Sequence, residues 1–395
     1  MAGKLRYLLL PMIAILAVGA VQSAMTSVWR ERRPAWTLAV DPRDGIAAIR
    51  QADLVLAGAV DPGTTLSNLA PTARAAIANT PLNPSALGLL GAAEFVANHP
   101  EAGSRLLNLS QRLSRRDLRT QIVLIEQAVG RGDVNGALRH YDLALSTNNA
   151  AGDLLFPVLG RAIAAPQVRD SLATYVRRDP SWLRRFLVHY IASPENPVAL
   201  SQLIRRAGGL PAHPDYRHYE TQVLWALTQR GAFDEARALF LMLPGATPAM
   251  LRSVSISPDN AQFRFGPMAW LLIDRPEVGA ALEAPDRLSV RMGSGQGGLA
   301  AQKYLYLLPG DYRFSFKAMF GEEGGRATIQ LWCSSPGPAK RLFNRELLPH
   351  QPVAVSDTWS VPKGCTTQLL MITATGDDTQ AESNLQLSNI AAEKL

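Results

Sequence analysis

Cysteine and aromatic residues are the side chains of this 395-residue chain whose types suggest chemistry. Its two cysteines, Cys333 and Cys365, both lie in the last third of the chain. We expect them to form a disulfide between neighbouring strands, with two buried reduced thiols as the alternative. The aromatic residues Tyr304, Tyr306 and Trp359 lie in the same region and are candidates for stacking on sugar rings.

Catalytic, cofactor and metal sites are not predicted by the sequence. The six histidines show no H-E-x-x-H or similar spacing, and two isolated cysteines do not supply the four ligands of a zinc site. Residues 293–298 match G-x-G-x-x-G, but they lie between two expected strands with no helix after them, which predicts a hairpin loop. We therefore expect a chain that binds no cofactor and is not an enzyme.

Composition and charge limit the classes of protein to which this chain can belong. Hydrophobic residues make up 47% of the chain and charged residues 18%, so it can build real cores, and its length predicts two or three domains. Of the formal charge of +7, +4 lies in residues 1–33, +3 in 34–251 and none in 252–395. Because most of the excess flanks one apolar segment, we expect no nucleic-acid partner.

The apolar segment lies between Arg6 and Arg30. Tyr7–Trp29 has no charged residue and is long enough for a helix to cross a hydrocarbon core of ~30 Å. It predicts an uncleaved anchor within a first region of residues 1–33, with a signal peptide cleaved after Val18–Ala20 as the alternative. The predicted location is the bacterial inner membrane, single-pass, with the rest of the chain in the periplasm, an oxidising compartment that suits a disulfide.

Two segments of the middle region, Leu118–Ala151 and Arg217–Met250, align without gaps at a separation of 99 residues. Each has a glycine at a turn, then a small alanine and an aromatic residue on the next helix: Gly132, Ala137, Tyr141 and Ala144, and Gly231, Ala236 and Phe240. This pattern resembles the tetratricopeptide repeat, although Gln121 stands where that family usually has tryptophan. The resemblance implies an α-solenoid over residues 34–250 that binds a partner protein or peptide.

The remaining region, residues 251–395, shows short alternating runs between glycine and proline turns. Leu307–Phe316 resembles the "PG-x-Y-x-hydrophobic" hairpin of jelly-roll modules of the carbohydrate-binding type, and Phe265–Trp270 and Leu385–Ile390 suit the first and last strands of such a module. The seven expected strands are Arg287–Met292, Ala301–Leu308, Asp311–Phe320, Arg326–Cys333, Val353–Ser360, Gln368–Thr375 and Leu385–Ala391. They predict an antiparallel β-sandwich.

Together these features predict a multidomain α plus β protein with a transmembrane helix, a tetratricopeptide-like solenoid and a jelly roll. The architecture is similar to accessory proteins of envelope polysaccharide assembly or export. It implies a non-enzymatic scaffold that holds a partner protein in the solenoid, while the sandwich contacts polysaccharide or protein. The alternatives are a carbohydrate-binding protein whose solenoid is a spacer, and an unrecognised enzyme acting on glycans.

Overall fold

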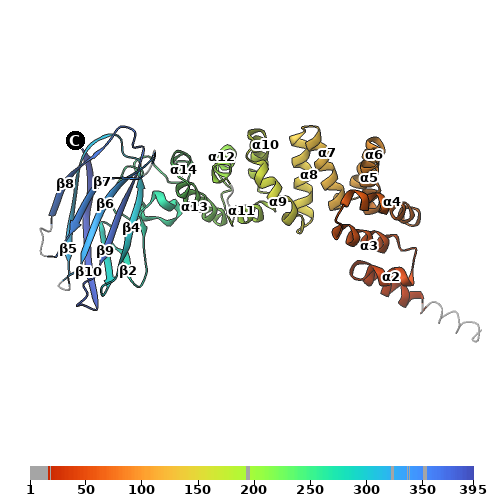
Figure 1. The fold of residues 1–395 in the computed structure, drawn as a ribbon, viewed down its shortest axis with the longest axis horizontal. Coiled ribbons are helices and arrows are strands. Elements are labelled where there is room, and N and C mark those ends of the chain that lie inside the picture. The colour runs from red at the N-terminus through yellow and green to blue at the C-terminus, as the bar shows by residue number, and fades with distance from the viewer. Residues whose placement is uncertain are drawn as a thin grey trace, which may run out of the picture. The chain divides into compact units, whose positions relative to one another are not determined.

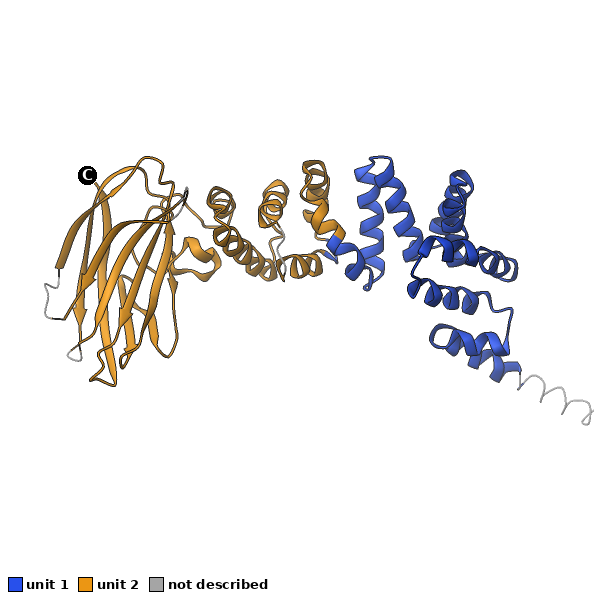
Figure 2. Cartoon of the chain, in the orientation of Figure 1, with its two compact units in different colours: residues 1–157, 180–182 blue, residues 158–179, 183–395 orange. Residues whose placement is uncertain are grey.

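The computed structural model describes residues 17, 19–192, 196–321, 324–335, 337, 339–349 and 354–395. It divides into two compact units, one formed by residues 1–157 and 180–182 and the other by residues 158–179 and 183–395 (Figure 2). The first unit is helical, and the second contains further helices followed by the strands. The region boundaries predicted at residues 33 and 250 stay predictions.

Helices occupy the chain up to residue 240, and strands follow from residue 271 (Figure 1). The helices are α2 (Pro34–Val40), α3 (Gly45–Ala57), α4 (Pro62–Asn79), α5 (Pro84–Val96), α6 (Pro100–Leu113), α7 (Leu118–Gly130), α8 (Val134–Thr147), α9 (Ala151–Ala162), α10 (Pro166–Val176), α11 (Leu183–Ala192), α12 (Pro197–Ala207), α13 (Pro214–Gln229) and α14 (Phe233–Phe240).

Short polar side chains fix where several of these helices begin. The side chains of Asp44, Asp61 and Asn83 accept hydrogen bonds from backbone N–H groups in the first turns of α3, α4 and α5. Asp117 and Asp133 do the same for α7 and α8. These bonds satisfy donors that have no partner within the helix, so each cap sets the start of its helix.

The two aligned segments fold alike around their glycines. Gly132 follows α7 and Gly231 follows α13, and each has a φ of 70°. The N–H of Asp133 donates to the carbonyl of Ala128, and the N–H of Ala232 donates to the carbonyl of Leu227, which is the hydrogen bond of a Schellman turn. Glycine adopts this left-handed conformation at low cost, so both turns rest on the same residue type.

The expected membrane anchor requires a correction. Most of its first half lies outside the described residues, and residues 19–32 are helical. Among the residues that the structure describes, no helix combines the length and the apolar character needed to cross a bilayer. The single-pass inner-membrane location drawn from Tyr7–Trp29 is therefore not supported by the part of the chain that the structure describes.

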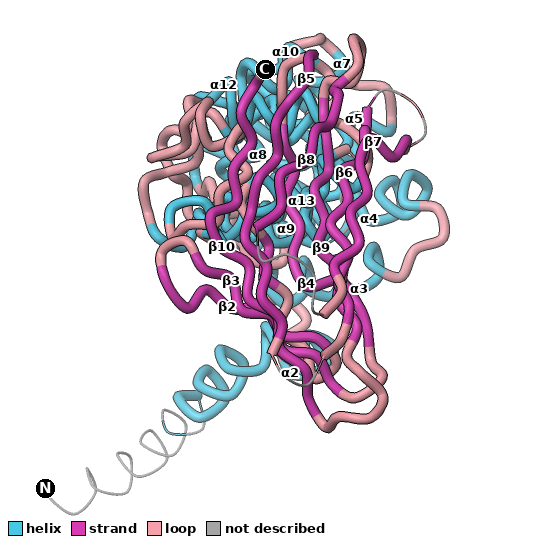
Figure 3. The backbone as a smooth tube through the Cα atoms, turned by 90° about the vertical axis from the view of Figure 1, so that its left-hand side faces the viewer, coloured by secondary structure: helices cyan, strands magenta, loops and turns pink. Residues whose placement is uncertain are grey.

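The strands form two five-stranded antiparallel sheets that pack as a sandwich (Figure 3). Sheet A has the order β1-β4-β9-β6-β7 and sheet B the order β2-β3-β10-β5-β8. The strands are β1 (Leu271–Leu272), β2 (Val278–Ala284), β3 (Arg287–Gly293), β4 (Gly297–Leu305), β5 (Gly310–Phe320), β6 (Arg326–Ser335), β7 (Lys340–Leu347), β8 (Ala354–Val361), β9 (Thr367–Thr375) and β10 (Glu382–Lys394).

The segment before the first strand belongs to the sandwich core. Val254 and Ile256 are buried with the inward-facing residues of both sheets. Next to them Lys303, on β4, is 0% exposed, and its Nζ donates to the carbonyl of Ser253 at 3.0 Å. The buried lysine therefore joins the connecting segment to sheet A by a hydrogen bond.

The last helices of the second unit and its sandwich share buried contacts. The Tyr306 hydroxyl, just after β4, donates to the Phe233 carbonyl at the start of α14 at 2.7 Å. Phe240 of α14 packs edge-on against Phe265, which lies in the 3₁₀ helix Phe263–Met268. The expected first strand Phe265–Trp270 is thus largely this 3₁₀ helix, and pairing begins at Leu271.

Candidate functional site

The outward-facing sides of the two sheets differ in chemistry. On sheet B the outer face presents polar and charged residues such as Arg291, Arg313 and Lys317. Sheet A instead carries large apolar and aromatic side chains that are only partly buried. We call this surface the sheet A face, and its residues are Gln302, Tyr304, Gln330, Trp332, Arg341, Asn344, Leu369 and Met371.

Strand register places these residues in two rows across sheet A. Leu369 of β9 lies between Tyr304 of β4 and Trp332 of β6, and Trp332 pairs with Arg341 of β7. Because neighbouring strands lie about 4.8 Å apart, Tyr304 and Trp332 are roughly 10 Å apart across the sheet. The second row runs parallel to the first and consists of Gln302, Met371, Gln330 and Asn344.

Hydrogen bonds orient the polar groups beside Trp332. The indole Nε1 of Trp332 donates to Oε1 of Gln330 at 3.1 Å, and Nε2 of Gln330 donates to Oδ1 of Asn344 at 2.9 Å. The guanidinium of Arg341 lies over the indole ring, 5.9 Å from its centroid. Among the described residues the Nδ2 donor of Asn344 has no partner, so it is available to a ligand.

Two of the three aromatic residues predicted to stack on sugars are buried. Trp359 is 3% exposed and stacks on Phe314 in the core, with ring centroids 4.4 Å apart. Tyr306 is 6% exposed, with its hydroxyl bound to α14, and burial raises its pKa. Neither ring is open to a sugar, so for these two the prediction was wrong.

Tyr304 is the one predicted aromatic residue on the sheet A face. Its side chain is partly exposed, but its ring packs against Phe233 of α14 with centroids 5.3 Å apart. Burial raises the pKa of its phenol. Tyr304 therefore closes one end of the row, and the open part of the face is centred on Trp332.

The candidates drawn from the sequence do not include Trp332, which directly precedes Cys333. Its neighbours Leu331 and Ile329 are the core residues, while Trp332 and Gln330 face outward. Two-residue alternation gives the two faces of β6, but it does not say which face is inside. The local sequence holds no signal for this, and only the pairing with β9 decides it: Leu331 lies opposite buried Leu370, and Trp332 opposite partly exposed Leu369.

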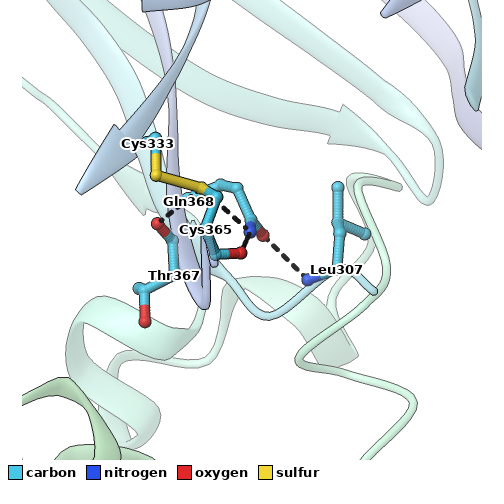
Figure 4. The surroundings of a disulfide bond; sticks show 5 residues. All are labelled: Leu307, Cys333, Cys365, Thr367 and Gln368. Carbon is cyan, nitrogen blue, oxygen red and sulfur yellow. Dashed lines mark hydrogen bonds between the residues drawn. A yellow bond between two sulfur atoms is a disulfide. The ribbon is translucent and has the colours of Figure 1, made fainter. Parts of the chain in front are cut away.

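A disulfide fixes the chain next to this site (Figure 4). Cys333, directly after Trp332, is bonded to Cys365, as predicted. Beside the bridge the Gln368 amide donates to the Cys365 carbonyl at 2.8 Å, and its Oε1 accepts from the Leu307 N–H at 2.8 Å. These contacts hold the ends of β4, β6 and β9 together, so the Trp332 end of the row is anchored.

The helical first unit contains a groove that bears on the predicted partner site. Its cavity volume is about 730 Å³, and apolar Leu54 and Ile122 line it together with Arg50 and Glu126. Within it Arg119 forms an ion pair with Asp53, and burial lowers the pKa of Arg119 to about 10. Partner binding there stays a prediction, which co-purification from cells would test.

The repeat signature residues lie in the seams between paired helices. Ala137, Tyr141 and Ala144 are buried on α8, and Ala236 and Phe240 are buried on α14. Among the described residues, no group of three metal-ligating side chains is close enough to hold a metal ion.

Comparison with known proteins gives a structural likeness only. No family model matches the chain, so the tetratricopeptide assignment is not confirmed, and no curated protein matches it. Solved structures with a carbohydrate-binding-module sandwich match the strand region at low similarity. A CBM4 structure has 13% identity, covers 33% of this chain and 88% of its own, and has a TM-score of 0.26.

Two further structures match to a similar degree. TmCBM61 in complex with β-1,4-galactotriose has 14% identity and a TM-score of 0.24, covering 34% of this chain and 96% of its own. The N-terminal cellulose-binding domain of Cellulomonas fimi β-1,4-glucanase C has 13% identity and a TM-score of 0.24, covering 36% of this chain and 92% of its own.

Proposed function

We propose that this protein binds a polysaccharide chain on the sheet A face. The observation that carries the proposal is the partly exposed indole of Trp332, placed beside Leu369 and Met371 and bonded to an ordered pair of amide side chains. An exposed face of a β-sheet is normally polar, as sheet B is apart from Met319, so a face that groups several large apolar side chains points to a ligand.

The chemistry of this face matches that of a sugar chain. Sugar rings present C–H groups on their flat sides and hydroxyl groups around their edges. An indole offers a broad apolar surface to the flat side, and the amides of Gln330 and Asn344 both donate and accept, as hydroxyl recognition requires. Because the polar groups hold one another in place, little side-chain freedom is lost on binding.

The rows also suit a ligand longer than one sugar. Tyr304 closes one end beside α14, while β7 forms the opposite edge of sheet A and carries Arg341. A chain lying across the strands would therefore cross Leu369, Trp332 and Arg341 in turn. For the helical part we keep the predicted tetratricopeptide solenoid, supported by the matching turns at Gly132 and Gly231. In the whole protein it would bring a partner protein to the polysaccharide, as a scaffold in its assembly or export.

The test is affinity electrophoresis of the full chain in gels that contain cellulose derivatives, xylan, galactan or polygalacturonate. We expect at least one of these polysaccharides to retard the protein, and Trp332→Ala to weaken that retardation about tenfold or more, because stacking surface is lost. Circular dichroism would check that the variant is folded.

The matched control is Phe263→Ala, which removes an aromatic side chain that is 69% exposed and lies outside the sheet A face. It should leave retardation unchanged. Equal losses in both variants, or a folded Trp332→Ala protein that binds as tightly as the parent, would contradict the proposed site.

A further inference from the structure

A second hollow, in the helical first unit, is lined by arginines. Its cavity volume is about 750 Å³, and its lining residues are Asn108, Gln111, Arg112, Arg115, Arg139 and Leu143. They come from the end of α6, the turn after it, and α8. No acidic residue is among them, so the hollow has a strongly positive lining.

The three arginines lack the ion pairs that several others have. Elsewhere in this unit Arg74 pairs with Glu94, and Arg119 pairs with Asp53. Within the described part of the chain, Arg112, Arg115 and Arg139 have no carboxylate within 4.0 Å. Three guanidinium groups that share one hollow without a counter-charge repel one another, and an anion placed between them would relieve that repulsion.

Buried polar contacts hold the two sides of this hollow in place. Gln121 of α7 is 0% exposed, its Nε2 donates to the carbonyl of Arg115 at 3.4 Å, and its Oε1 lies 2.9 Å from Nδ1 of buried His140. His140 directly follows Arg139 on α8. One buried glutamine therefore ties the backbone at Arg115 to the helix that carries Arg139.

This arrangement gives Gln121 a role that the repeat pattern does not. Gln121 stands where a tetratricopeptide repeat usually has tryptophan, which would fill the seam but could not bond to Arg115 and His140 together. The pKa of His140 is lowered by burial first and then by the positive charges of Arg139 and Arg131. A neutral imidazole suits the bond to Gln121 and agrees with a positive field around the hollow.

The lining also indicates the class of anion. Arginine forks bind planar carboxylates with two hydrogen bonds, and the Asn108 and Gln111 amides suit hydroxyl groups. No aromatic side chain lines the hollow, so the stacking platform that a nucleic acid needs is missing there. The volume suits a ligand of several rings better than one small ion.

We propose that the hollow formed by Arg112, Arg115 and Arg139, with Asn108 and Gln111, binds the carboxylate groups of an acidic oligosaccharide. This site is in a different unit from the sheet A face and does not rest on the function proposed there. Gln121 acts as a positioning residue, because it touches the backbone of Arg115 and not the ligand.

The test uses the full chain carrying Trp332→Ala, so that the sheet A face contributes little, and titrates it with oligogalacturonate in a calorimeter. We expect binding that weakens as NaCl rises, because salt screens exposed charges. Adding Arg112→Gln, Arg115→Gln and Arg139→Gln should weaken it about tenfold or more, since the charge-assisted bonds are lost.

The matched control adds Arg43→Gln, Arg161→Gln and Arg217→Gln, which remove the same charge from exposed arginines outside the hollow. It should change the affinity less than about twofold, as expected for screened distant charges. Equal losses from both triple changes, or no binding of oligogalacturonate, would overturn the proposal. Inorganic phosphate that binds as tightly as oligogalacturonate would also overturn it, because a small anion would then be the ligand.

A second variant tests whether Gln121 positions the arginines of the hollow. Gln121→Leu keeps all the arginines, so we expect weaker oligogalacturonate binding with its salt dependence unchanged. A variant that melts at lower temperature but binds with the parent affinity would show that Gln121 is only structural.

Discussion

Lys303 is the most unusual single residue of the sandwich. Its side chain is fully enclosed, and burial lowers its pKa from 10.5 to about 7 because the ammonium group loses its water. Its one hydrogen bond in the described residues goes to the Ser253 carbonyl, and no carboxylate lies within ion-pair distance of it there. The folded protein therefore favours the neutral amine at a position where the unfolded chain holds a proton.

This difference predicts a pH dependence of stability. Between pH 7 and 10 the unfolded chain binds more protons at Lys303 than the folded chain, so the free energy of unfolding should rise with pH, by up to about 1.4 kcal/mol per unit. Below pH 7 both states are protonated and the contribution levels off. Urea unfolding at pH 6 to 9 measures it.

Lys303→Met should remove that slope and raise the stability at pH 7 by roughly 2 to 4 kcal/mol, because the desolvation cost disappears while one hydrogen bond is lost. Parallel pH profiles for the parent and the variant would show that Lys303 does not titrate between these limits.

Single residues also show how far sequence can locate a site. The disulfide followed from two cysteines and the export-like N-terminus, and the structure contains it. The exposure of the aromatic residues could not be predicted from the sequence, because it depends on residues far away in the chain. Trp359 is covered by Phe314 and Phe343, and Tyr306 is covered by α14. Burial by another element leaves no mark on the local pattern.

At the scale of elements, two neighbouring glycines allow a matched comparison. Gly132 has a φ of 70°, while Gly130 ends α7 with helical backbone, and a Cβ at either would meet no described atom within 4 Å. Backbone conformation is therefore the only difference between them. Gly132→Ala should destabilise the protein by about 1 to 2 kcal/mol, and Gly130→Ala should stabilise it by roughly 0.5 to 1 kcal/mol.

Thermal or urea unfolding of the two alanine variants measures these changes. If both glycine replacements shift stability in the same direction, the left-handed turn is not what Gly132 provides.

Strands β2 and β7 were not predicted from the sequence, and each omission has a physical reason. The β2 sequence VGAALEA is rich in helix formers, and it becomes a strand through pairing with β3. The β7 sequence KRLFNREL has charges at both ends because it is an edge strand, where exposed charge discourages further pairing. The G-x-G-x-x-G run joins β3 of sheet B to β4 of sheet A, so the expected hairpin is a crossover between sheets.

At the scale of the whole molecule, the disulfide closes a loop with a sequence separation of 32 residues that contains β7 and β8. A loop of this length predicts about 3 to 4 kcal/mol of stabilisation from reduced freedom of the unfolded chain. Replacing both cysteines by alanine should lower the free energy of unfolding by that amount and weaken polysaccharide binding, because Cys333 adjoins Trp332.

Unfolding of the double variant, with the parent protein in reducing buffer as the control, checks this prediction. Mass spectrometry without reduction would count free thiols, and two free thiols in native protein would contradict the bridge itself.

The hydrogen bond from Tyr306 to Phe233 also limits where a fragment that contains the sandwich can begin. A fragment that starts at residue 251 would match the boundary suggested by sequence, yet it would remove the acceptor of a buried phenol and uncover the ring of Tyr304. A fragment that keeps these contacts must begin upstream of Phe233, so it includes α14. The sandwich is therefore a poor choice for fusion to another protein as an independent module, unless the last helices are included in the fragment.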